Sequence, residues 1–151
     1  MLKTIRTTSI SPDFIQLTRK LDAALKMIYG STQEEFDQYN IIQNLDTVVI
    51  AYLDEIPAGC GCFKRFDENA AELKRMFVGD EFRGRGIGAT ILLELETWAG
   101  ELGYASLILE TGTVQTEAVS LYRKFGYSVI PNFDPYIGND LSVCMQKTIG
   151  G

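Results

Sequence analysis

The sequence predicts an α+β protein with a mixed, mostly antiparallel central sheet flanked by helices. In the first half of the 151-residue chain, three strand-like runs are joined by short polar turns, as in an antiparallel meander. In the second half, strand-like runs alternate with amphipathic helical patterns, which adds a strand–helix–strand connection. The length suits one domain and there is no linker or repeat, so we expect residues 1–151 to form a single domain.

The N-terminal part is expected to hold one strand and two helices. Residues 4–10 are a short β-type run. The segment Ser11-Pro-Asp13 then provides an N-cap, a first-turn proline and an acid near the positive end of a helix. Apolar residues follow at helical spacing up to Gly30, where the helix ends; they are Phe14, Leu17, Leu21, Leu25 and Ile28. A shorter helix is expected from Ser31, which opens a capping-box pattern.

The meander is expected to follow. Its three strands cover residues 47–53, 56–66 and 71–78. Asp54-Glu55 forms the first hairpin turn, and Gly59 and Gly61 are expected to bend the second strand.

The second half contains the remaining elements. An amphipathic helix stops near Gly103 and carries the apolar residues Ile87, Ile91, Leu92, Leu95, Trp98 and Ala99. Strands are predicted over residues 106–110, 127–130 and 141–147, and a helix over 116–125 that Gly126 closes. The last two strands are joined by a loop that contains Phe133 and Tyr136.

Composition excludes several classes of protein. The net charge of −6 argues against a nucleic-acid binder, which needs a basic face, and is compatible with a cationic substrate such as an amine. No run approaches the ~18 apolar residues of a membrane span. The N-terminus lacks the apolar region and cleavage site of a signal peptide, so we expect a cytoplasmic protein with no membrane partner.

The cysteines and the missing histidines limit the chemistry. Cys60 and Cys62 lie two apart and share a strand face, and Cys144 is the third cysteine. An odd number of cysteines, no export signal and no histidine predict buried apolar thiols and no metal site. Acid–base chemistry must then use Asp, Glu, Tyr, Cys, Lys, a terminus or water.

A glycine- and arginine-rich loop opens the helix that begins near Ile87. It follows a strand and a charged turn, and it places backbone N–H groups, a helix N-terminus and two guanidinium groups around one point. Such a point favours an anion such as a pyrophosphate.

Two other nucleotide loops compete for this segment. Gly84–Ala89 formally matches the dinucleotide fingerprint G-x-G-x-x-A, with Glu110 as the acid at the end of a later strand. The charged turn before the first glycine and the antiparallel strands before it disfavour that interpretation. A P-loop would need a Gly-Lys-Ser/Thr ending, which is missing.

Two motifs resemble one family. Arg83-Gly-Arg-Gly-Ile-Gly88 resembles the [Gln/Arg]-x-x-Gly-x-[Gly/Ala] acyl-CoA motif of the GNAT superfamily of N-acyltransferases, and Glu72–Val78 looks like the strand that leads into it. Ala118-Val-Ser-Leu-Tyr-Arg-Lys-Phe-Gly-Tyr127 resembles the downstream A-x-x-L-Y-x-K-x-G-[FY] motif. One position departs, because Gln115 stands where many relatives carry Asn.

The resemblance implies a fold and a cofactor. The fourth and fifth strands would splay apart, with acetyl-CoA bound along the fourth and its pyrophosphate on the glycine-rich loop. Backbone groups of Met76 and Val78 would bind the pantetheine amides, and no metal is needed. The cofactor-binding residues would be Met76, Phe77, Val78, Arg83, Gly84, Arg85, Gly86, Ile87, Gly88, Gln115 and Tyr122.

The resemblance also implies a reaction. A primary amine of a small molecule or peptide would attack the thioester directly. Glu72 would act as general base, directly or through water, and Tyr122 as general acid on the departing thiolate. A backbone N–H near Phe77 or Val78 would polarise the thioester carbonyl.

Three points stay open in the sequence. Phe36, Tyr39, Phe133 and Tyr136 would line the acceptor site or pack in the core, and the acceptor itself is not named. Relatives are often homodimers, which no feature of this chain decides. A non-catalytic acyl-CoA sensor on the same fold is the alternative function.

Overall fold

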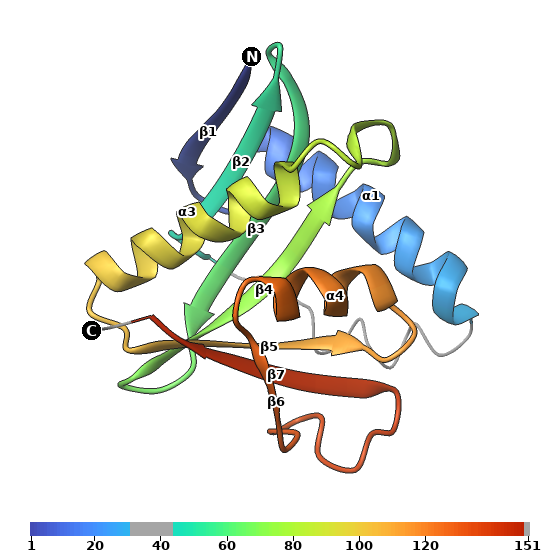
Figure 1. Cartoon of the computed structure of the whole chain (residues 1–151). Coiled ribbons are helices and arrows are strands. Elements are labelled where there is room, and N and C mark those ends of the chain that lie inside the picture. Colours follow the sequence, from blue (N-terminus) through green and yellow to red (C-terminus); the bar gives the residue numbers. More distant parts are fainter. Residues whose placement is uncertain (31–43, 150–151) are drawn as a thin grey trace. The chain divides into compact units, whose positions relative to one another are not determined.

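Figure 1 shows the computed structural model of the chain, which describes residues 1–30 and 44–149. The chain divides into two compact units. The first comprises Met1–Lys64 and Lys74–Leu95, and the second Arg65–Leu73 and Glu96–Gly151. The helix expected from Ser31, together with Phe36 and Tyr39, lies outside the described residues.

The first unit is built from an antiparallel meander and a long helix. It holds β1 (Leu2–Thr7), α1 (Pro12–Tyr29), β2 (Val48–Leu53), nearly all of β3 (Ile56–Arg65) and the later part of β4 (Ala70–Val78). The turn between β2 and β3 has positive φ at Asp54 and Glu55, as a tight two-residue hairpin requires. The predicted hairpin at these two residues is thus confirmed.

Helix α1 begins and ends where its caps predict. Ser11 Oγ accepts a hydrogen bond from the Phe14 backbone N–H at 3.4 Å, Pro12 follows at the first turn, and Gly30 is the C-cap with φ of 59°. Phe14 and Leu17 are buried in a core cluster with apolar residues of β2 and β3. The predicted apolar face ends early, because Ile28 is half exposed.

The two cysteines of β3 lie in this core. Cys60 and Cys62 are fully buried, as is Cys144 of the second unit, and none of the three forms a disulfide within the described residues. This confirms the prediction of buried apolar thiols.

A short connection joins β4 to the next helix. The 3₁₀ turn η2 (Asp80–Phe82) precedes the glycine-rich loop, and α3 (Ile87–Glu101) begins directly after it. The inner face of α3 is almost completely buried and consists of Ile87, Ile91, Leu92, Leu95 and Ala99. This matches the predicted amphipathic helix, and it fixes the helix N-terminus beside the loop.

The second unit adds three strands and one helix. They are β5 (Ser106–Gly112), α4 (Thr116–Lys124), β6 (Ser128–Ile130) and β7 (Ser142–Thr148). The first residues of β4 pair in parallel with β5, and β7 pairs antiparallel with both β5 and β6. Within the described residues the β4–β5 register covers Ala70 to Glu72, which fits the predicted divergence of these two strands.

The sheet confirms the predicted fold class. Within the described residues, seven strands follow the order β1-β2-β3-β4-β5-β7-β6; β4 and β5 pair in parallel, whereas the pairs β1–β2, β2–β3, β5–β7 and β6–β7 are antiparallel. Among the described helices, none has the length and apolar character needed to span a membrane.

Candidate active site

The glycine-rich loop lies in the first unit. Gly84 and Gly86 have φ of 79° and 76°, and a Cβ added to either would meet no atom within 4 Å. The backbone conformation therefore demands glycine here, because side-chain-bearing residues rarely adopt positive φ. Residues 83–86 are exposed, and the N-terminus of α3 follows at once. Exposed arginines beside a helix N-terminus can hold an anion.

Arg83 is anchored at the entrance to this loop. Its Nη2 lies 3.3 Å from Asp80 Oδ1, and its Nε donates to the Val78 carbonyl oxygen at 3.5 Å. Half of its side chain stays exposed. The charged turn before the loop thus orients the first arginine of the motif while its guanidinium remains accessible.

The end of β4 lies tightly against two glycines of β3. A Cβ on Gly59 would come within 2.6 Å of the Phe77 carbonyl oxygen, and one on Gly61 would collide with Met76 Sδ. Glycine at position 59 therefore allows close approach of the β4 backbone, and glycine at position 61 leaves room for the Met76 side chain. A register shift also occurs in the β2–β3 pairing, between Ala51 and Tyr52.

Glu72 and Glu110 lie on one face of the second unit. Glu72 pairs with Ile108 in the parallel register, and Glu110 follows two residues later on the same face of β5. Glu72 is buried, and Glu110 accepts a hydrogen bond from Ser142 Oγ at 2.7 Å. Cys144 is the register partner of Glu110; burial raises the pKa of its thiol, and so do the charges of both carboxylates. Three ionisable groups therefore share this face.

Glu110 is a site candidate that the motifs do not point to. In the sequence it stands out only as the acid of the disfavoured dinucleotide site. Glu110 lies two residues beyond Ile108, the register partner of Glu72, and therefore on the same face of β5; the sequence alone does not reveal this register.

Tyr122 lies on α4 and is buried. Its ring packs against Tyr127 with centroids 5.6 Å apart. Burial raises the pKa of its phenol, and the negative charge of Glu110 raises it further. Tyr122 therefore keeps its proton across the neutral range and can act as a hydrogen-bond donor. Gln115 is the N-cap residue of α4, although its side chain makes no capping hydrogen bond.

The two aromatic residues of the 131–141 loop take part in side-chain packing. The Phe133 ring lies 5.2 Å from that of Phe66 and 5.8 Å from that of Tyr136, measured between centroids. Tyr136 is 1% exposed, which favours core packing over a place in an open acceptor site. Phe133 is only partly buried and stays a candidate lining residue.

The predicted site residues thus fall into two groups. Met76–Val78 and the loop Arg83–Gly88 belong to the first unit, whereas Glu72, Gln115 and Tyr122 belong to the second. The first group offers backbone donors and an anion-holding loop. The second offers a buried carboxylate and a protonated phenol, which are groups that move protons.

Comparison with known proteins identifies the family. The profile of the Acetyltransferase (GNAT) family matches residues 15–127. The "IAA acetyltransferase" of Azospirillum brasilense is 31% identical over 146 residues, which cover 95% of each protein. A candidate acyl-CoA N-acyltransferase from Klebsiella pneumoniae, whose structure is solved, is 27% identical with a TM-score of 0.82 and covers 99% of this chain and 98% of its own.

A second solved structure extends the likeness of fold. A GNAT family acetyltransferase from Elizabethkingia anophelis, with acetyl-CoA bound, is 21% identical with a TM-score of 0.69 over 97% of both chains. The family match spans both motifs noted in the sequence, in residues 83–88 and 118–127. The chain belongs to the GNAT acetyltransferase family and is an acyltransferase that acts with acetyl-CoA.

Proposed function

We propose that this enzyme transfers the acetyl group of acetyl-CoA to a primary amine of a small molecule or peptide, within one domain of residues 1–151. The observation that carries the proposal is the loop Arg83–Gly88, where two left-handed glycines and two exposed arginines precede the N-terminus of α3. Backbone N–H groups and a helix dipole at such a place favour a pyrophosphate. Membership of the GNAT family indicates that this pyrophosphate is the one in acetyl-CoA.

The proposed cofactor contacts follow from this placement. The pyrophosphate binds at Arg83, Gly84, Arg85, Gly86, Ile87 and Gly88. The pantetheine amides bind backbone groups of Met76 and Val78, and the thioester carbonyl takes a backbone N–H at Phe77 or Val78. Gln115 and Tyr122 are the remaining residues proposed to bind the cofactor. Residues 76–78 are half-buried, which is compatible with a ligand along this part of β4.

The proposed base is Glu72. An amine is mostly protonated near neutral pH and must lose a proton before it attacks a thioester. A buried carboxylate accepts that proton directly or through one water molecule. Glu110 on the same face is a second carboxylate that can accept a proton, and Ser142 Oγ donates a hydrogen bond to it. The acceptor amine is then neutral at the moment of attack.

Isothermal titration with acetyl-CoA tests the cofactor. Binding of one acetyl-CoA per chain, with competition by CoA, is expected from the loop. No binding, or tighter binding of NAD, would overturn the proposal.

Replacement of Tyr122 by phenylalanine tests the proposed acid. The hydroxyl donates a hydrogen bond to the departing thiolate, and a hydrogen bond to a charged group contributes roughly 1.5–3 kcal/mol, or about 10–100-fold in rate. We expect kcat to fall by about that factor with little change in acetyl-CoA affinity. Steady-state kinetics and titration measure the two effects separately. An unchanged kcat would remove Tyr122 from the mechanism.

A further inference from the structure

The backbone of β4 departs from a regular strand at Arg75. This residue has φ of 58°, which belongs to the left-handed region that side-chain-bearing residues rarely adopt. The carbonyl oxygens on either side of the irregular step accept hydrogen bonds from two thiols of β3. Cys62 Sγ donates to Lys74 O at 3.3 Å, and Cys60 Sγ to Arg75 O at 3.5 Å. Side chains of β3 thus satisfy two successive carbonyls, as happens where a strand bulges and its ladder is interrupted.

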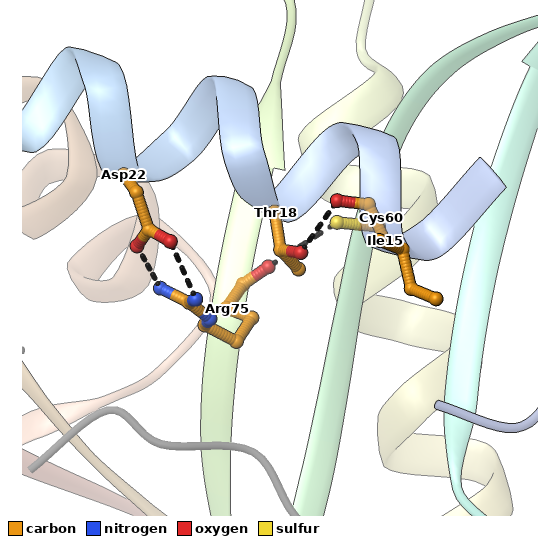
Figure 2. A network of polar contacts seen from close by, with 5 residues as sticks. All are labelled: Ile15, Thr18, Asp22, Cys60 and Arg75. Carbon is orange, nitrogen blue, oxygen red and sulfur yellow. Dashed lines mark hydrogen bonds and ion pairs between the residues drawn. The ribbon is translucent and has the colours of Figure 1, made fainter. Parts of the chain in front are cut away.

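The Arg75 side chain is tied to α1. Its Nη1 and Nη2 donate to the two carboxylate oxygens of Asp22 at 2.7 and 3.1 Å, a bidentate pair that Figure 2 shows beside the Cys60 contact. The Arg75 side chain is 10% exposed and that of Asp22 is 45% exposed. Within the described part of the chain, Arg75 Nε is a buried donor without an acceptor.

These features make Arg75 an unfavourable choice for packing alone. A left-handed backbone disfavours any residue with a Cβ, and a buried guanidinium with an unsatisfied donor is costly. Glycine would avoid both effects. Strained residues of this kind persist where the surroundings hold them and where function uses the strained shape. The surroundings are visible here as the Asp22 pair and the Cys60 thiol.

The strained residue Arg75 lies directly before Met76–Val78, the segment whose backbone is proposed to bind acetyl-CoA. Met76 and Phe77 follow it: the Phe77 carbonyl oxygen lies so close to Gly59 that a Cβ there would have no space, and the Met76 side chain lies over Gly61. We propose that Arg75, through its ion pair with Asp22, is a positioning residue that holds the left-handed step of β4 and so orients the backbone groups of Met76–Val78 for acetyl-CoA. This assignment rests on the proposed function, and it gives the Cys60 thiol a supporting role on the Arg75 carbonyl.

Two replacements at position 75 separate this role from others. Both alanine and glycine remove the ion pair, but alanine disfavours positive φ whereas glycine adopts it readily. If acetyl-CoA binding requires the left-handed conformation at residue 75, a smaller fraction of Arg75→Ala molecules adopts that conformation. The apparent affinity of this variant for acetyl-CoA then falls in proportion to that fraction. We expect Arg75→Ala to bind acetyl-CoA about tenfold more weakly than Arg75→Gly, the factor that such backbone strain represents.

Asp22→Asn provides a milder variant that keeps Arg75 in place. It should weaken acetyl-CoA binding in the same direction, because the guanidinium loses its charged partner. The matched control is Tyr52→Phe. It removes the hydrogen bond that Tyr52 Oη of β2 donates to the Asp13 carboxylate of α1 at 2.6 Å, which is another contact between α1 and the sheet. The control should lower the unfolding temperature and leave acetyl-CoA affinity unchanged.

Titration calorimetry and thermal unfolding of these four variants decide the matter. Equal loss of affinity in Arg75→Ala and Arg75→Gly would mean that the charge of Arg75 acts on the ligand, which overturns the positioning role. Unchanged affinity in Asp22→Asn, with a lowered unfolding temperature, would make the pair purely structural and overturns it as well. If the unaltered protein binds no acetyl-CoA, the proposed function fails, and the assignment of Arg75 fails with it. If Arg75→Ala does not fold, Asp22→Asn against Tyr52→Phe still gives the answer.

Discussion

Replacing Glu72 by glutamine is expected to lower kcat by about 10²–10⁴-fold, the usual contribution of one general base. The amide keeps the size of the side chain and removes the proton acceptor. Acetyl-CoA affinity should change little, because the proposed base acts on the amine. Steady-state kinetics at several pH values measure the loss, and the remaining rate should depend on pH differently from that of the unaltered enzyme.

Glu110→Gln is the matched comparison for Glu72→Gln. It makes the same chemical change on the same face of the second unit, two residues beyond the register partner of Glu72. A smaller loss than that of Glu72→Gln is expected. A larger loss would move the role of base to Glu110, and unchanged kinetics in Glu72→Gln would contradict the role of Glu72 outright.

Replacing Gly86 by valine should weaken acetyl-CoA binding by at least about tenfold, because a residue with a Cβ is disfavoured by this amount in the left-handed conformation. Gly86 has φ of 76°, and its carbonyl accepts both the backbone N–H and the hydroxyl of Thr90 in the first turn of α3. A shift of this backbone would displace the N–H groups that the pyrophosphate needs. Titration calorimetry measures the change.

Gly103→Val controls for the general effect of strain. Gly103 has φ of 93° just beyond the end of α3, and a Cβ there would also meet no atom within 4 Å. It should lose stability to a similar degree while keeping acetyl-CoA affinity. Equal loss of affinity in both variants would show that strain anywhere around α3 weakens binding, and the loop would lose its special role.

Local signals predicted the limits of the described helices α1 and α4 well. Ser11, Pro12 and Gly30 mark the limits of α1, and Gly126 follows the end of α4, since caps act through neighbouring residues. Strand limits were harder to predict because pairing with distant strands sets them. The first strand was expected over residues 4–10, yet β1 spans Leu2–Thr7, because its register with β2 ends at the Thr7–Val48 pair.

Long-range strand pairing also explains why part of the candidate site could not be predicted from the sequence. β5 continues to Gly112 because it pairs with Ser142 of β7, and β7 lies between β5 and β6, an order that no local pattern reveals. The hydrogen bond between Ser142 and Glu110 joins residues that are 32 positions apart. The left-handed step at Arg75 has no sign of its own in the sequence, and only the small residues of β3 hint at the close approach there.

The most direct test of the central claim is thiol release from acetyl-CoA in the presence of a panel of primary amines, with mass spectrometry of the products. Release of CoA that depends on both the enzyme and one class of amine, together with an amine heavier by one acetyl group, is the predicted result. Tight binding of acetyl-CoA without acetylation of any amine in the panel would contradict it and would favour a non-catalytic acyl-CoA sensor.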